Sequence, residues 1–291
     1  MELETKFRAF QLDTDGSLFS YFKSNHYTLI EARIPKGGIN IIITDLEFHE
    51  KRNIDTLHIT SWDTDHCSYN DLVQILNKLR PSIIEIPSYE PDTDTGKLCK
   101  KTIEGYDDIH EKYKPNVRVM SKEYISQLPN AEANDTNNVV YHSTYNSDKK
   151  NDMSLIKLFR STGFNVLSLG DCESQEIAKY LLAVGFITTE VDVLILPHHG
   201  ADNGFLTGDF LDKVRPKIAI CSSNHGNEYD HPKPNIRALF SARNIPLMTT
   251  KRGDVIALHE KSSKVSRALN LISNNEDKEP EVHFIPKRFS K

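Results

Sequence analysis

The chain has 291 residues, of which 38% are apolar and 26% charged, a composition that indicates a globular protein with one large α/β domain or two small ones. The net charge of −5 argues against a broadly basic surface for nucleic acid but leaves a local one open. The first residues lack the pattern of a secretory signal, and no apolar run approaches the roughly 20 residues of a membrane span. We therefore expect a cytoplasmic protein with no membrane partner.

The first half of the chain is rich in expected strands. Apolar runs predict strands near 6–12, 27–34, 38–44 and 54–60, a helix over Tyr69–Leu79 and a strand over 82–86, with Gly37-Gly38 as a hairpin turn. Residues 87–115 are polar, contain a helix expected from Cys99 to Tyr113, and form a candidate lid insertion. The Asn- and Asp-rich residues 130–138 predict a loop.

In the second half, strands alternate with helices. Strands are predicted at 139–144, 153–159, 164–169, 191–196, 217–222 and 254–258, and helices at about 173–184, 206–214 and 233–243. This alternation indicates an α/β fold whose helices lie outside the sheets. Residues 262–291 are charged and show little periodicity, so we expect a polar C-terminal tail that is free to meet a protein partner.

One apolar run ends in three potential metal ligands. The run from Leu57 leads to Asp63, Asp65 and His66, and carboxylate oxygens beside an imidazole suit a divalent cation such as zinc or manganese. A polar turn whose aspartates bind backbone amides explains this motif about equally well.

Two later runs end in the same way. The strand predicted over 164–169 leads to Asp171, and the strand predicted over 191–196 leads to His198 and His199. Three such endings would converge if the three strands lie side by side in one sheet. This convergence favours a metal site, although a Gly-Asp turn or a His-His pair taken alone is more often structural.

The order of these motifs resembles the metallo-β-lactamase superfamily, and within it the soluble hydrolase domain of ComEC-type competence proteins. The resemblance rests on five motifs: Asp63-x-Asp65-His66, Asn151-x-x-Ser154-Leu155, Leu169-Gly170-Asp171, Leu196-Pro197-His198-His199-Gly200 and His231-Pro232. It implies a four-layer αββα sandwich over residues 1–261 and a metal-dependent hydrolase.

The chain departs from the family pattern at Ser61, where the superfamily has a histidine. The remaining residues implied as ligands of a first cation are Asp65, His66, Asp171 and His198, and a second site would keep Asp63 and share Asp171. Since a serine hydroxyl is a poor ligand for zinc, we expect one tight metal and a second site that is weak or absent.

For catalysis we expect a water molecule activated by the metal, with Asp63 and Asp65 orienting the water or accepting its proton. His199 or His231 would donate to the substrate or the leaving group. For His231 the alternative is almost as good, because His-Pro followed by a helix is also a common helix start.

The function most consistent with these features is a phosphodiesterase or nuclease that acts on nucleic acid or a nucleotide. The preference for a phosphodiester comes from the resemblance to the competence proteins. A hydrolase of a small ester, lactone or amide would use the same water, and a metal-depleted binding or regulatory module is the alternative that Ser61 suggests.

Overall fold

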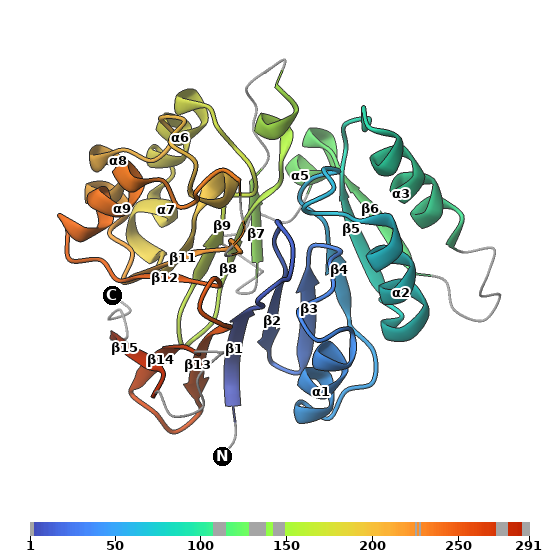
Figure 1. Ribbon diagram of the computed structural model, residues 1–291, viewed down its shortest axis with the longest axis horizontal. Helices are drawn as coiled ribbons and strands as arrows, with labels where there is room; N and C mark the ends of the chain where they lie inside the picture. Colours follow the sequence, from blue (N-terminus) through green and yellow to red (C-terminus); the bar gives the residue numbers. More distant parts are fainter. Residues whose placement is uncertain are drawn as a thin grey trace.

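The computed structural model describes residues 3–106, 115–127, 138–141, 149–224, 226, 228–271 and 279–286. Two β-sheets face each other across the middle of the molecule, and helices cover the outer face of each (Figure 1). The helices of the first half lie on one side, and those of the second half lie on the other.

The larger sheet is mixed and is built mostly from the first half of the chain. Its strand order is β15-β14-β13-β1-β2-β3-β4-β5-β6, in which β3 to β6 run parallel and the other neighbours are antiparallel. The strands are β1 (Leu3–Ala9), β2 (Phe19–Lys23), β3 (His26–Ile30), β4 (Thr56–His58), β5 (Ile83–Pro87), β6 (Asn116–Met120), β13 (Val255–Glu260), β14 (Val265–Asn270) and β15 (Glu281–Pro286).

The smaller sheet has the order β12-β11-β10-β9-β8-β7, and β9 to β12 are parallel. Its strands are β7 (Asn138–Tyr141), β8 (Ile156–Phe159), β9 (Val166–Ser168), β10 (Val193–Ile195), β11 (Ile218–Cys221) and β12 (Leu247–Thr249). The parallel strands β9, β10 and β11 are fully buried, as expected where both faces of a sheet are covered.

The helices are amphipathic and bury one face each. In α2, Leu72, Ile75, Leu76 and Leu79 recur at spacings of three and four residues and are all buried. The helices of the first half are α1 (Asn40–Phe48), α2 (Tyr69–Leu79), α3 (Asp94–Glu104) and α5 (Lys122–Gln127). Those of the second half are α6 (Gln175–Leu182), α7 (Gly185–Glu190), α8 (Gly208–Val214) and α9 (Pro234–Ser241), with short 3₁₀ turns at Lys150–Met153 and Pro197–Gly200.

Three hydrophobic clusters separate the layers. One packs α1 to α3 on the larger sheet, a second packs α6, α8 and α9 on the smaller sheet, and a third fills the space between the sheets. The buried ion pair of Lys157 with Glu85, at 2.6 Å, also links the two sheets. Helix, sheet, sheet and helix form the four-layer αββα sandwich that the sequence predicts.

Several local expectations are wrong. Residues 38–44, predicted as a strand, begin helix α1, because Ile42, Asp45 and Leu46 share one face and turn it to the core. Gly37-Gly38 accordingly leads into a helix and is not a hairpin turn. Strand β2 was missed, although it pairs along its whole length with both β1 and β3.

The candidate lid and the expected tail also differ from the structure. Helix α3 begins at Asp94, and its Cys99 and Ile103 enter the same core as α2, so this part of 87–115 is a layer of the fold. In the expected tail, β14 and β15 pair in register with β13 and extend the larger sheet. The end of the helix predicted to Tyr113 and most of the loop predicted over 130–138 lie outside the described residues. None of the described helices is long and apolar enough to cross a membrane.

Candidate metal centre

Three chain segments meet where the two sheets adjoin. One follows β4 and carries Asp65 and His66, the second follows β9 and carries Asp171, and the third follows β10 and carries His199. The expectation that all three strands belong to one sheet is wrong, because β4 lies in the larger sheet and β9 and β10 lie in the smaller one. The cluster therefore depends on how the two sheets pack.

A glycine is required just before Asp171. Gly170 has φ +54°, and a Cβ there would lie 2.7 Å from the Cβ of Ser154. A side chain at position 170 would thus separate the segment carrying Asp171 from Ser154, which follows the 3₁₀ turn at Lys150–Met153. The motifs that contain Ser154 and Gly170 therefore pack directly against each other.

Four donor atoms, one each from Asp65, His66, Asp171 and His199, lie within 4.8 Å of one another. Nε2 of His66 is 2.8 Å from Oδ1 of Asp171. Nε2 of His199 is 3.1 Å from Oδ2 of Asp65 and 3.9 Å from Oδ1 of Asp171. Two imidazoles and two carboxylates at this spacing form a compact donor set for one cation.

Outer contacts hold each imidazole with one nitrogen directed inward. Nδ1 of His66 lies 3.1 Å from Oε1 of the buried Glu31, which also accepts hydrogen bonds from the backbone and hydroxyl of Thr60. Nδ1 of His199 lies 3.0 Å from the carbonyl oxygen of Ser222. Each Nδ1 is thus placed as a donor, so that Nε2, once a cation displaces its proton, carries the lone pair that a metal ligand requires.

The inner atoms pair imidazole with carboxylate around one point, His66 with Asp171 and His199 with Asp65. Nε2 of His66 and Oδ1 of Asp171 are buried and form an ion pair at 2.8 Å, without the geometry of a regular hydrogen bond. Two imidazole nitrogens and two carboxylate oxygens directed at one point are the ligand types that a divalent cation takes in proteins. The residues present therefore fit a divalent cation.

The charges of the cluster agree with this interpretation. Burial alone lowers the pKa of His66, but the carboxylates of Asp171, Glu31 and Asp65 outweigh it and raise that pKa well above its usual value. Against burial, His66 and His199 lower the pKa of Asp65. A concentration of negative charge that raises the pKa of a buried imidazole also attracts a metal ion.

The structure places His198 differently from the sequence-based expectation. His199, and not His198, supplies the imidazole of the four-atom group. Nδ1 of His198 lies 2.8 Å from Oε1 of Glu173, which also accepts a hydrogen bond from Asn151. Both histidines have positive φ, 45° and 53°, and this tight turn decides which ring faces the cluster.

Asp63 lies beside the cluster but outside the four-atom group. Its Oδ2 accepts a hydrogen bond of 3.0 Å from the hydroxyl of Ser61, and that hydroxyl is 2.9 Å from the hydroxyl of Tyr89. Burial raises the pKa of Asp63, and the nearby carboxylates of Asp171 and Asp65 raise it further, while Ser61 opposes the shift.

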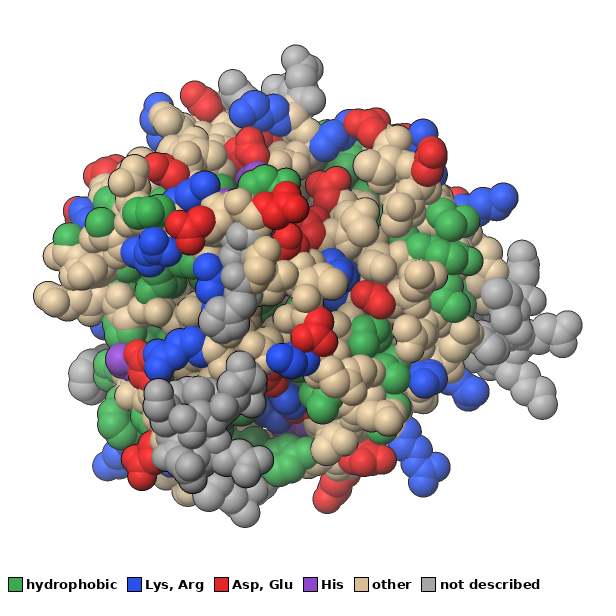
Figure 2. All heavy atoms as spheres, viewed as in Figure 1, with side chains coloured by type: hydrophobic (Ala, Val, Ile, Leu, Met, Phe, Trp, Pro, Cys, Tyr) green, Lys and Arg blue, Asp and Glu red, His purple; other side chains and the backbone are tan. Residues whose placement is uncertain are grey.

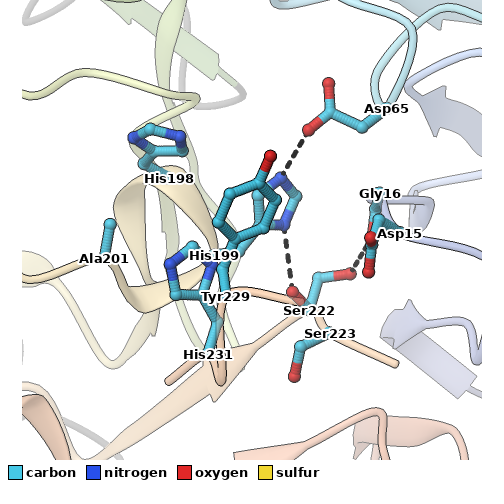
Figure 3. Close-up of a pocket in the computed structure, with 10 residues that line it drawn as sticks. All are labelled: Asp15, Gly16, Asp65, His198, His199, Ala201, Ser222, Ser223, Tyr229 and His231. Carbon is cyan, nitrogen blue, oxygen red and sulfur yellow. Dashed lines mark hydrogen bonds and ion pairs between the residues drawn. The ribbon is translucent and has the colours of Figure 1, made fainter. Parts of the chain in front are cut away.

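A pocket of about 350 Å³ opens onto the cluster (Figure 3). Asp65, Asp15 and Gly16 form one wall, and His198, His199 and His231 form the other, with Tyr229 in front. The ring of His231 stacks on that of His199 with centroids 6.4 Å apart. Burial and the neighbouring His199 and His198 lower the pKa of His231 to about 4.

Several residues that shape this site were not expected from the sequence. Glu31 directly follows the apolar strand β3, and a carboxylate at such a buried strand end was an available signal. Glu173 follows Asp171 by two residues, but nothing in the sequence connects it with His198. Tyr89 and Gly16 come from segments whose position only the fold determines: Gly16 lies against Asp65, and its carbonyl accepts a hydrogen bond from Ser222.

No family model matches the chain. Over 225 residues, 77% of its length, it is 23% identical to ComE operon protein 3 of Bacillus subtilis (strain 168) and covers 27% of that protein. Over 58 residues, 20% of its length, it is 40% identical to competence protein ComA of Neisseria gonorrhoeae and covers 8% of it. The chain thus spans about a quarter or less of the curated relatives it matches, and the resemblance to competence proteins is confirmed.

Solved structures agree at the level of the fold. The metallo hydrolase Igni18 of Ignicoccus hospitalis matches with a TM-score of 0.54 at 13% identity, over 87% of this chain and 98% of the other. The metallo-β-lactamase fold protein YhfI of Bacillus subtilis matches with a TM-score of 0.50 at 10% identity, over 88% of this chain and 100% of the other. With the four layers and the clustered donors, these likenesses show that the chain has the metallo-β-lactamase fold.

Proposed function

We propose that the protein is a metal-dependent hydrolase. The observation that carries this proposal is the group of four donor atoms that lie within 4.8 Å of one another, beside an open pocket. Asp65, His66, Asp171 and His199 would hold the cation. When bound, a divalent cation there supplies Lewis acidity, lowering the pKa of a water molecule and neutralising charge on a substrate oxygen.

The chain's own residues prepare the site for this chemistry. Glu31 and the carbonyl of Ser222 keep both ligand imidazoles in one orientation, so little reorganisation accompanies binding. His231 is neutral at pH 7 because of its lowered pKa, and it offers the pocket an uncharged imidazole. The sequence-based assignments of Asp63 and His231 to proton transfer stay predictions.

We further propose that the substrate is a phosphodiester of nucleic acid or a nucleotide. Lys233 and Lys251 lie close enough to His231 to lower its pKa, and neither makes an ion pair within the described part of the chain. Arg252, in contrast, pairs with Glu281 at 2.8 Å. Figure 2 shows Lys and Arg mixed with Asp and Glu on the visible face, so any attraction for phosphate is local. The likeness to competence proteins supports the same substrate class.

The test is hydrolysis by the purified chain with manganese, magnesium or zinc. Single-stranded and duplex oligonucleotides, a cyclic dinucleotide and a generic aryl phosphodiester are compared with an aryl ester and a lactone. We expect turnover of phosphodiesters that Asp171→Asn abolishes. Turnover of the ester or lactone alone would reject the phosphodiester proposal, and unchanged turnover in Asp171→Asn would reject the metal-dependent hydrolase.

The two lysines test the substrate contact separately. We expect Lys233→Gln and Lys251→Gln each to raise KM for an oligonucleotide. Each variant should also depend less on salt: the slope of log KM against log salt should fall by about 1 for each phosphate contact that is lost. Arg252→Gln is the matched control, because its charge is already paired with Glu281. Equal effects of all three variants would exclude a specific role of the lysines in binding phosphate.

A further inference from the structure

The side of the centre that contains Asp63 is closed by hydroxyl groups. A second cation beside the first would have to take ligands from positions 61 and 63 in addition to a shared carboxylate. In the structure, the Ser61 hydroxyl binds Oδ2 of Asp63 on one side and the hydroxyl of Tyr89 on the other. The inference drawn from this arrangement rests on the proposed function, because it presupposes a first cation.

The Ser61 hydroxyl already makes all the hydrogen bonds that its one proton and two lone pairs allow. It donates its one proton to Oδ2 of Asp63 at 3.0 Å. Its oxygen therefore accepts from the Tyr89 hydroxyl at 2.9 Å, and it also accepts from the backbone N–H of Asp63 at 3.2 Å. A hydroxyl has one proton and two lone pairs, so none is left for a metal ion.

Tyr89 cannot turn away without leaving buried groups unpaired. Its hydroxyl accepts the backbone N–H of Trp62 at 3.0 Å, and its carbonyl accepts the indole N–H of Trp62 at 3.0 Å. Tyr89 is 6% exposed and Trp62 is 1% exposed. Burial raises the pKa of Tyr89 to about 12, so the hydroxyl keeps its proton at neutral pH. Breaking either hydrogen bond would cost the desolvation of a buried donor.

We propose that Tyr89, acting through Ser61, occupies the position beside Asp63 and limits the centre to one cation. Tyr89 is thus a positioning residue that sets the number of metal ions. Replacing Ser61 by histidine is then not enough to create a second site, because the tyrosine hydroxyl still stands beside residue 61. Both positions must change.

The experiment measures cation stoichiometry, without reference to activity. The full chain is stripped of metal and titrated with Mn²⁺ by calorimetry, and the spin coupling between neighbouring Mn²⁺ ions is followed by electron paramagnetic resonance. We expect one equivalent for the wild type, for Ser61→His and for Tyr89→Phe. For Ser61→His combined with Tyr89→Phe we expect two equivalents and a coupled-pair signal. Tyr106→Phe is the matched control, since it removes another buried tyrosine hydroxyl, one that donates to the carbonyl of Leu76.

Each result decides between the proposals. Two equivalents in the wild type, or two in Ser61→His alone, overturn the role of Tyr89 and leave the metal-dependent hydrolase intact. One equivalent in a folded double variant, judged by its thermal unfolding and by retained affinity for the first cation, also overturns that role. No binding by folded wild type overturns the proposed function and this inference with it.

Discussion

The two sides of the centre contain similar residue types in different states. On one side, four donor atoms face one point and lie within 4.8 Å of one another; they come from Asp65, His66, Asp171 and His199. On the other side, the carboxylate of Asp63 binds the hydroxyl of Ser61, which binds Tyr89. The difference teaches that an aspartate close to a metal site joins it only where the surrounding contacts turn its oxygens toward the other donors.

The largest expected effect comes from making the same substitution on each side. Asp171→Asn removes a buried negative charge from the four-atom group. We expect cation affinity to fall by more than about 100-fold, which is more than the loss usually caused by replacing a residue that only hydrogen-bonds a ligand. Asp63→Asn should change it by less than about tenfold. Calorimetric titration of both variants with Mn²⁺ checks the contrast, and equal losses would show that Asp63 is a ligand.

The next effect tests how the cluster side is held in place. Glu31→Gln removes the charge that Nδ1 of His66 faces, so we expect cation affinity to fall by about 10- to 100-fold. The same titration measures it, with the exposed Glu47→Gln as control. Affinity equal to that of the control would mean that His66 does not depend on Glu31.

On the hydroxyl side we expect an effect on stability with little effect on the first cation. Tyr89→Phe leaves the backbone N–H of Trp62 without its partner and should lower the free energy of unfolding by about 1–2 kcal/mol. Urea denaturation of the cation-free protein measures this change, and the exposed Tyr180→Phe should be close to neutral. A tenfold loss of first-cation affinity in Tyr89→Phe would contradict the separation of the two sides.

The smallest effect is a difference in titration between two neighbouring aspartates. In the cation-free protein the pKa of Asp63 is raised and that of Asp65 is lowered, so as the pH falls Asp63 takes up its proton first. A lowered pKa in the folded state means that ionised Asp65 stabilises the fold above its unfolded pKa of about 3.9, and this contribution is lost as the pH falls through the folded pKa. Carboxyl ¹³C chemical shifts measured against pH would follow both groups. Proton uptake by Asp65 before Asp63 would contradict the charge environment of the cluster.

Much of the architecture was predictable because it depends on local patterns. The structure contains the strands predicted from the apolar runs before Asp171 and His198. It also contains helix α2, which was predicted from the spacing of its apolar residues. The strand predicted at 38–44 was wrong because a run of isoleucines does not distinguish strand from helix. The last two strands were missed because the buried positions of β14 hold Ser266, Ala268 and Asn270, so its burial alternates without an alternation of hydropathy. Both strands depend on pairing, β14 with β13 and β15 with β14.

The candidate site was predictable as a set of segments but not as a set of atoms. Asp65, His66 and Asp171 were expected to meet and lie together in the structure. The choice between His198 and His199 depends on two residues with positive φ in one turn, and no spacing rule reveals it. Glu31 and Tyr89 come from distant positions in the chain, so only the packing of the sheets brings them to the cluster.

The sequence by itself determined the chemistry available, because the acidic and imidazole side chains at the ends of apolar strands are readable one after another along the chain. Only the tertiary structure decided which of them share a point in space and which are bound to neighbours. That decision belongs to the packing of the two sheets, since a ligand is defined by the direction of its lone pair, and this direction depends on residues that are far away along the chain.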